Sequence, residues 1–430
     1  MSMFGYTTLG FGSGGSSPTT YSTATAMGSN VTHMIFGDGA WLDGSGATNN
    51  QTAPHWVGFI QSTTTYHKIW PYAFDPDTKT LSTTGSEWIA STGTSAGAIT
   101  PAQLSNDRAM VHYYYSDSGY RTYSNLWDLN AGLTNFDNEL VTHTQDQMYG
   151  QGWRLGDEYG LTTSNSNPSF SGYKFHHYTG GASYTSSAKR TSGSTSYQVA
   201  STVIGGGSTA RERAADSKEI MTIHNNYGSM GSATILDIGT YTWSGVDGAS
   251  ITHANNTNVL TLPTHTGSTM PPQPIATSWG NVVVHADTDT PNNAVIFPIT
   301  WSGTTPTVGS SVTWSGGAGL PANEIQWDGI DGYAKYMSSP WNCGEKPGSP
   351  DVYNTFRIYE VAGDMVVDTI EVDFSSNTGA NSVTVKQSAI YTFEGSTTAT
   401  VQWFFPLNGT DLVLFHRDTE TFVYLENAYY

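Results

Sequence analysis

The stretch NVVVHADTDTPNNAVIF, residues 281–297, decides the expected fold of this chain. It contains an apolar run that ends near a histidine, a polar turn and a second apolar run. Similar stretches lie at residues 109–129, 219–238 and 411–429, and the histidines recur as His112, His224, His285 and His416. Val, Ile, Tyr, Phe and Thr, which favour strands, dominate the runs. Each stretch therefore predicts a β-hairpin with a histidine towards the end of its first strand.

The spacing of these histidines predicts a repeat. They are separated by 112, 61 and 131 residues, which correspond to two, one and two units of 56 to about 65 residues. Further hairpin candidates fill the gaps at residues 56–74, 158–178 and 331–361, the last with an enlarged turn. Self-similarity at such a period is typical of repeat architectures. We therefore expect seven related units along the chain.

A unit of this length has room for four short strands. In residues 274–314 these read PIATSWG, NVVVHAD, NAVIFPITWS and TPTVGSSVTW. Four-stranded antiparallel sheets repeated around an axis form a β-propeller. We expect an all-β, seven-bladed β-propeller, with six or eight blades also allowed and a pair of β-sandwiches as the alternative. The expected blades are residues 30–95, 96–147, 148–203, 204–265, 266–320, 321–385 and 386–430.

Closure of such a ring needs the two ends of the chain to meet. The sequence ends at YLENAYY, in the third strand of the last unit, so the fourth strand must come from elsewhere or be missing. One interpretation is that a segment within Met3–Gly12 supplies it, followed by a flexible Gly- and Ser-rich connector at residues 13–30. The other is that residues 1–29 form an arm that docks on another protein. The sequence leaves both interpretations open.

The composition excludes several partners and compartments. The 430 residues include 16 Lys and Arg against 35 Asp and Glu, a formal net charge of −19, which disfavours nucleic acid and anionic membranes. The single cysteine, Cys343, allows neither a disulfide within the chain nor a cysteine-based zinc site. No apolar run is long enough for a membrane span or a secretory signal, so synthesis in a cytoplasm is expected.

Candidate functional residues fall into two groups. The recurrent histidines are interpreted as structural residues that hold the hairpin turns. Aromatic and histidine side chains near loops are candidate binding residues, because they suit glycan or protein recognition: Tyr113, Tyr114, Tyr115, His176, His177 and Trp341. No nucleophile elbow, phosphate-binding loop or dinucleotide fingerprint is present, so no catalytic residue, metal or cofactor is assigned. Asp287–Thr290 lacks calcium-loop spacing, and Ser116–Trp127 departs from the Asp-box spacing of sialidase-type propellers.

Two stretches carry a resemblance to a class of proteins. MSMFGYTTLGFGSGGSSP, followed by a chain rich in Gly, Ser, Thr and Asn, and the unit at residues 293–314 look like tailed-bacteriophage virion proteins. The resemblance implies a non-enzymatic tail fibre, tail appendage or capsid decoration that binds a host receptor or glycan. It also implies attachment to other virion proteins through residues 1–29, and a virion location after synthesis in the host cytoplasm. The alternatives are a glycan-active propeller enzyme of glycoside hydrolase or sialidase type and a cellular lectin-like propeller. Formation of a homo-oligomer is left open.

Overall fold

The computed structural model of this chain consists, in its described part, of β-strands and turns. We find no helix in that part with the length and hydropathy needed to cross a membrane. The structure describes residues 18–25, 31–36, 55–62, 66–75, 77–83, 87–92, 99–105, 108–115, 121–128, 134–141, 151–156, 159–166, 170–178, 184–192, 197–203, 212–214, 217–225, 235–244, 250–261, 273–287, 293–315, 344–346, 348–377, 382–394, 402–407, 410–416 and 419–430.

The strands of the described residues pair antiparallel in seven sheets, which we number in chain order. Sheet 1 consists of β2 (Val31–Phe36), β3 (His55–Ser62), β4 (Tyr66–Asp75), β5 (Thr80–Thr83) and β6 (Trp88–Thr92). Sheet 2 consists of β7 (Ile99–Ser105), β8 (Arg108–Tyr115), β9 (Arg121–Asp128) and β10 (Thr134–Val141). Sheet 3 consists of β11 (Gln151–Gly156), β12 (Tyr159–Ser166), β13 (Phe170–Tyr178) and β14 (Tyr184–Ser192).

The remaining sheets follow the same strand order. Sheet 4 consists of β15 (Tyr197–Val203), β16 (Glu212–Ala214), β17 (Ser217–Asn225), β18 (Ile235–Ser244) and β19 (Ser250–Thr261). Sheet 5 consists of β20 (Gln273–Thr277), β21 (Gly280–Asp287), β22 (Asn293–Ser302), β23 (Thr305–Val308) and β24 (Val312–Ser315). Sheet 6 consists of β25 (Gly344–Glu345), β26 (Val352–Val361), β27 (Asp364–Asp373) and β28 (Ser382–Phe393). Sheet 7 consists of β29 (Gln402–Leu407), β30 (Asp411–His416), β31 (Thr421–Glu426) and β1 (Thr19–Ala24).

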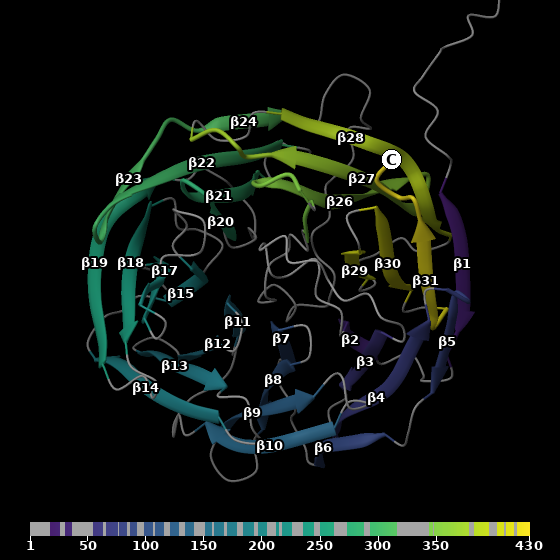
Figure 1. The fold of residues 1–430 in the computed structure, drawn as a ribbon, viewed down its shortest axis with the longest axis horizontal. Helices are drawn as coiled ribbons and strands as arrows, with labels where there is room; N and C mark the ends of the chain where they lie inside the picture. Colours follow the sequence, from purple (N-terminus) through teal and green to yellow (C-terminus); the bar gives the residue numbers. More distant parts are fainter. Residues whose placement is uncertain are drawn as a thin grey trace, which may run out of the picture.

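The sheets contact one another in chain order around a common centre. Their first strands contact each other in the pairs β2–β7, β7–β11, β11–β15 and β15–β20. Sheets 5 and 6 share an apolar cluster, and β29 contacts both β25 of sheet 6 and β2 of sheet 1. Figure 1 shows this arrangement, with the first strands nearest the centre and the last strands on the perimeter. The prediction of an all-β chain built from antiparallel sheets is confirmed.

Continuous apolar runs in the sequence arise because the central strands are covered on both faces. In β21, Val282, Val283 and Val284 are at most 1% exposed. Val282 and Val284 pack in a cluster with Tyr353 and Ile370 of sheet 6, while Val283 points to the opposite face of its sheet. In β30, every residue from Asp411 to His416 is buried. Such strands read as unbroken hydrophobic runs rather than alternating ones.

The N-terminal strand β1 completes sheet 7. It pairs antiparallel with β31 over six residue pairs, from Thr19↔Glu426 to Ala24↔Thr421. The predicted position of this strand within Met3–Gly12 is therefore wrong, and those residues lie outside the described ones. The prediction of a flexible connector over residues 13–30 is wrong for residues 19–24. Thr and Tyr have high strand propensity, and pairing with a preformed edge outweighs the Gly/Ser-rich composition around them.

Three other boundaries differ from the prediction. β15, expected in the third blade, pairs with β17 of sheet 4, and β28 runs on to Phe393 instead of ending at residue 385. Of the hairpin predicted over residues 331–361, residues 331–343 lie outside the described ones, and β26, in its second half, forms a hairpin with β27 over Val352–Asp373. Its turn residues Ala362 and Gly363 both have positive φ, 54° and 95°. Such a turn is usually marked by Asn-Gly or Asp-Gly, and Ala-Gly gave a weaker signal.

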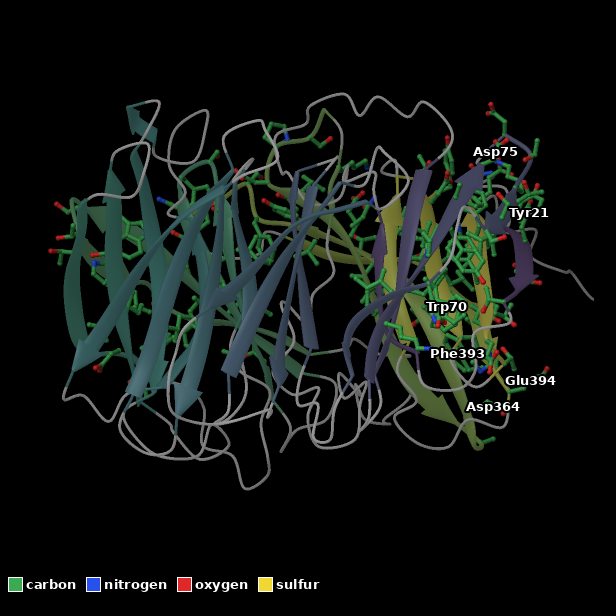
Figure 2. All side chains as sticks on the ribbon, turned by 90° about the horizontal axis from the view of Figure 1, so that it is seen from below. Tyr21, Trp70, Asp75, Asp364, Phe393 and Glu394 are labelled. Atoms are coloured by element: carbon green, nitrogen blue, oxygen red, sulfur yellow. The ribbon has the colours of Figure 1, made fainter. Side chains whose placement is uncertain are left out.

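The ring has two rims that can be told apart by strand direction. Second strands end and third strands begin at one of them, which contains Asp364 at the start of β27 and which we call the Asp364 rim. Third strands end at the other, which contains Asp75 at the end of β4 and which we call the Asp75 rim. Figure 2 shows Asp75 and Asp364 on opposite sides of the ring.

Candidate functional site

The structure separates the predicted binding residues into two groups. Tyr113, Tyr114 and Tyr115 end β8, the second strand of sheet 2, so they lie at the Asp364 rim. His176 and His177 lie near the end of β13, the third strand of sheet 3, and therefore at the Asp75 rim. Trp341 lies outside the described residues. These residues do not form one continuous binding surface, because the two rims lie on opposite sides of the ring.

The recurrent histidines all lie in the second strand of a sheet, between none and three residues before its end. His112, His224, His285 and His416 lie in the last residues of β8, β17, β21 and β30, and each of these is the second strand of its sheet. His416 is 5% exposed, and its ring packs edge-to-face on Phe393 of the neighbouring sheet, with ring centroids 4.6 Å apart. This contact gives His416 a packing role between sheets 6 and 7.

An aromatic cluster fills the interface between sheets 7 and 1, which we call the closing seam. Phe59 of β3 lies 4.9 Å from Phe415 between ring centroids. Phe74 of β4 lies 5.2 Å from Phe422 and 5.1 Å from Tyr424. Aromatic pairs of this geometry contribute about 0.5–1.5 kcal/mol each beyond their buried area. Sheets 7 and 1 are thus joined by closely packed aromatic side chains.

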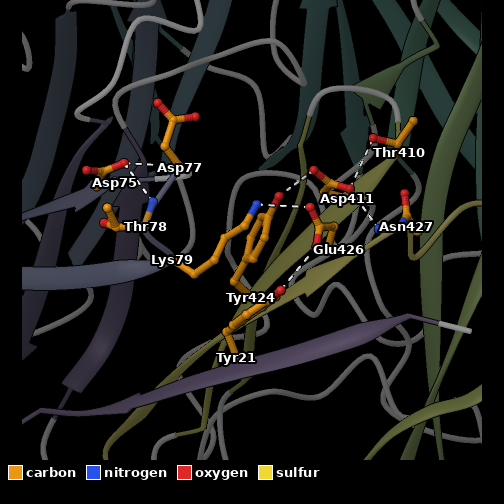
Figure 3. A network of polar contacts seen from close by, with 10 residues as sticks. All are labelled: Tyr21, Asp75, Asp77, Thr78, Lys79, Thr410, Asp411, Tyr424, Glu426 and Asn427. Carbon is orange, nitrogen blue, oxygen red and sulfur yellow. Dashed lines mark hydrogen bonds and ion pairs between the residues drawn. The ribbon is translucent and has the colours of Figure 1, made fainter.

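A polar network lies at the Asp75 rim of the closing seam (Figure 3). The Nζ atom of Lys79 lies 3.0 Å from Oε1 of Glu426, and the hydroxyl of Tyr21 donates to Oε2 of the same carboxylate over 3.3 Å. The Lys79 ammonium also lies 4.8 Å from the ring centroid of Tyr424 and 5.8 Å from that of Tyr21. One cation from sheet 1 therefore contacts both β1 and β31 of sheet 7.

The turn between β4 and β5 positions this lysine. Oδ1 of Asp75 accepts hydrogen bonds from the backbone N–H groups of Asp77, at 2.8 Å, and of Thr78, at 3.2 Å. Lys79 itself adopts a positive φ of 59°. Asp side chains that bond to backbone N–H groups two or three residues on are common turn formers. The short turn directs Lys79 across the seam to β31, 347 residues further along the chain.

A second carboxylate, Asp411, supports Tyr424 from within sheet 7. The Tyr424 hydroxyl donates to Oδ2 of Asp411 over 2.6 Å, while Oδ1 accepts from the backbone N–H of Asn427 over 2.8 Å and from Thr410 Oγ1 over 3.1 Å. Burial, with the hydrogen bond to Asp411, raises the pKa of the Tyr424 hydroxyl far above its ordinary value near 10. The hydroxyl therefore remains protonated at neutral pH and acts as a fixed donor.

A similar carboxylate joins sheets 5 and 6 at the same rim. Asp351 is 3% exposed and accepts hydrogen bonds from both the backbone N–H and the Oγ of Ser278. Nearby, the Trp279 indole N–H donates to the carbonyl of Phe374 over 2.7 Å, and the Tyr353 hydroxyl donates to the carbonyl of Ala276 over 2.8 Å. Buried polar bridges between sheets thus recur along the Asp75 rim.

These hydrogen bonds and ion pairs connect strands and hold them in place. Within the described segments, no group of three or more His, Cys, Asp or Glu side chains is placed to hold a metal ion. The carboxylates of Asp351, Asp411 and Glu426 are held by hydrogen bonds or an ion pair. This network was not predictable from the sequence. DPDTK at residues 75–79 is a recognisable turn, but nothing local indicates that Lys79 reaches Glu426.

Comparison with known proteins finds weak structural similarity alone. No protein-family model matches the chain, and no curated protein sequence matches it. A proposed 6-phosphogluconolactonase from Bacteroides uniformis is 9% identical over 82% of this chain and 85% of its own, with a TM-score of 0.43. The subtype N10 neuraminidase-like protein of a little yellow-shouldered bat isolate is 11% identical over 77% and 92%, with a TM-score of 0.38. The polysaccharide lyase Uly1 is 7% identical over 87% and 75%, with a TM-score of 0.35.

Proposed function

We propose that the chain is a seven-bladed β-propeller whose seventh blade is completed by β1. The seven described sheets and their contacts in chain order support this architecture. Closure by β1 removes the edge that β31 would otherwise expose, and radial closure of this kind protects sheet edges from unwanted pairing. Apolar clusters between sheets 5 and 6 and between sheets 6 and 7 match the packing expected between adjacent blades.

We further propose that this propeller is a non-enzymatic surface module of a bacteriophage virion, such as a tail appendage or capsid decoration. The observation that carries this proposal is the position of β1 as the outermost strand of sheet 7. The polypeptide before Pro18 joins the described fold at this perimeter strand. An anchor attached there leaves both rims accessible to a ligand, as a receptor-binding module requires. The virion-like composition of residues 1–18 supports such an anchor.

The proposed ligand is a glycan or protein of the host surface. Tyr113, Tyr114 and Tyr115 at the Asp364 rim are the residues we assign to this contact. Tyrosine rings combine a large apolar face with a hydrogen-bonding hydroxyl and lose little conformational entropy on binding. The net charge of −19 favours neutral or cationic surfaces over polyanions.

Deletion of residues 1–17 tests the anchor, because it leaves β1 intact. The truncated protein should keep the thermal stability and far-UV spectrum of the full chain but fail to co-sediment with phage particles that lack the native protein. The matched control is the full chain with residues 1–17 replaced by a Gly/Ser sequence of the same length. Normal attachment of either variant would contradict an anchoring role for this segment.

Incubation with purified bacterial surface polysaccharide tests the binding role. We expect saturable binding without release of reducing ends, and weaker binding after the triple change of Tyr113, Tyr114 and Tyr115 to Ser. Sustained release of reducing ends would instead support the glycan-active enzyme. Unchanged affinity of the triple variant would show that these tyrosines do not contribute to binding.

A further inference from the structure

The contacts of Lys79 lie at the end of β1 that is nearest to the proposed anchor. Thr19, the first residue of β1, pairs with Glu426, and Tyr21 pairs with Tyr424. Lys79 contacts Glu426 through an ion pair, and the rings of Tyr21 and Tyr424 through cation–π interactions. The beginning of the β1–β31 ladder is thus tied to the turn of sheet 1.

This placement matters when tension reaches β1 from the polypeptide before Pro18. Such tension loads the Thr19↔Glu426 end of the ladder first. At the other end, the backbone N–H and the Oγ of Thr25 both donate to the carbonyl of Glu420 over 2.7 Å. If the first residue pairs open, the remaining pairs can separate one after another. A contact at the loaded end therefore limits the release of the whole strand β1 from β31.

We propose that Lys79 is a mechanical latch that transfers load from β1 to sheet 1 and so prevents an anchored ring from opening. This inference rests on the proposed function, in which residues 1–17 attach the protein to a particle. The Lys79 and Glu426 side chains are only 19% and 33% exposed, so solvent screens their attraction less than that of a fully exposed pair. Because Lys79 contacts residues of both β1 and β31, it adds a connection from sheet 7 to sheet 1. This connection resists the separation of β1 from β31.

The chain offers a closely matched control in Lys68. Its Nζ lies 2.8 Å from Oε1 of Glu87, and the two side chains are 19% and 30% exposed. It also lies 5.9 Å from the ring centroid of Trp70. Lys68 thus has the same kind of ion pair and aromatic contact as Lys79, but Glu87 is only 19 residues away along the chain and Trp70 lies on the same strand. These two contacts are local to sheet 1 and do not connect it to β1.

Magnetic tweezers test the latch on the purified full-length chain, without particles. One handle is attached at the N-terminus and the other at a cysteine introduced at exposed Ser310 of sheet 5, in a Cys343→Ser background. Release of β1 frees the chain as far as Val31, which should lengthen the tether by up to about 40 Å at 3.3–3.6 Å per residue. The lifetime of the closed state before this step, at constant force, is the quantity measured.

We expect Lys79→Met to shorten that lifetime about tenfold, from loss of a partly buried ion pair and two cation–π contacts, and Lys79→Arg to retain most of it. Lys68→Met should change the lifetime less than about twofold, because its ion pair with Glu87 and its contact with the Trp70 ring are local to sheet 1. Equal effects of Lys79→Met and Lys68→Met would overturn the latch. Amide exchange at Tyr21 and Thr23 without force gives a second readout, and should accelerate in Lys79→Met alone.

The two proposals can fail separately. If Lys79→Met shortens the lifetime in the tweezers but particles bind the protein normally after deletion of residues 1–17, the anchoring role is refuted and the latch is supported. If the lifetime does not depend on Lys79 but deletion of residues 1–17 abolishes attachment, the latch is refuted and the anchoring role is supported.

Discussion

At the scale of single residues, the fold depends on a few buried hydroxyl and carboxylate groups. Tyr424 is 2% exposed and donates to Asp411, which is 7% exposed. Hydrogen bonds to charged acceptors contribute more to stability than neutral ones, because an unpartnered buried charge is costly. The sequence marks neither residue as special, since both lie in an ordinary strand pattern. The recurrent histidines, by contrast, were visible in the sequence because they repeat.

Removal of the Tyr424 hydroxyl should destabilise the fold in a pH-dependent way. Tyr424→Phe should lower the free energy of unfolding by about 2 kcal/mol at pH 7, the cost of a lost hydrogen bond to a charged group. The folded-state pKa of this hydroxyl is raised above 10, so its contribution is complete below about pH 10 and is lost as pH rises towards the folded pKa. Urea unfolding of both proteins between pH 7 and pH 11 measures this difference.

The difference between wild type and Tyr424→Phe should thus stay constant up to about pH 9 and narrow above pH 10. Tyr430→Phe is the control, because its side chain is 59% exposed and its hydroxyl should add little to stability. A difference that stays constant through pH 11 would contradict the assignment of the raised pKa.

At the same scale, Ala389 has an unfavourable backbone conformation. Its φ is 53°, and its N–H donates to Oδ1 of fully buried Asp368 over 2.7 Å, within a bulge of β28. Left-handed conformations are costly for residues with a Cβ. Ala389→Gly should therefore raise the free energy of unfolding by about 0.5 kcal/mol, whereas Ala276→Gly in strand β20 should lower it by about 0.5–1 kcal/mol. Stabilisation by both changes, measured by denaturant titration, would refute the strain assigned to Ala389.

At the scale of elements, β1 is the strand that sequence patterning located least well. The need for a closing strand followed from an incomplete last unit, but TTYSTA carries no apolar alternation that would identify it. The hairpins of β21–β22 and β30–β31 were recognisable because both faces of these strands are buried and rich in Val, Ile, Leu and Phe. An outer strand with one exposed edge and exposed Thr19, Thr20 and Ser22 gives no such signal.

The pairing pattern of β1 predicts opposite effects for proline at neighbouring positions. The Thr25 N–H donates to Glu420, so in an antiparallel ladder the N–H of Thr23 also points to β31, while that of Ser22 points outward. Thr23→Pro removes a ladder hydrogen bond and should cost about 3 kcal/mol, whereas Ser22→Pro should cost much less. Thermal unfolding of the two variants checks this order. A larger loss for Ser22→Pro would mean that the register of β1 is different.

At the scale of the whole molecule, the repeat in the sequence was sufficient to predict antiparallel sheets in series. Unit boundaries were less certain, because β15 and the end of β28 carry no histidine mark. Contacts between sheets could not be predicted, since Lys79 and Glu426, or Ser278 and Asp351, meet only after the sheets have assembled. The contact on which the arrangement of the sheets depends most is the pairing of the N-terminal strand β1 with β31.

An engineered disulfide between β1 and β31 tests this pairing. Ala24 and Thr421 face each other at a non-hydrogen-bonded pair of the ladder, where Cα atoms lie about 4.5 Å apart. Ala24→Cys with Thr421→Cys, in a Cys343→Ser background, should oxidise to a cross-linked form that migrates faster on a non-reducing gel. Thr20→Cys with Thr421→Cys, displaced by four residues or about 13 Å along the strand, should not. Cross-linking of the displaced pair with none of the facing pair would contradict the pairing of β1 with β31 in this register.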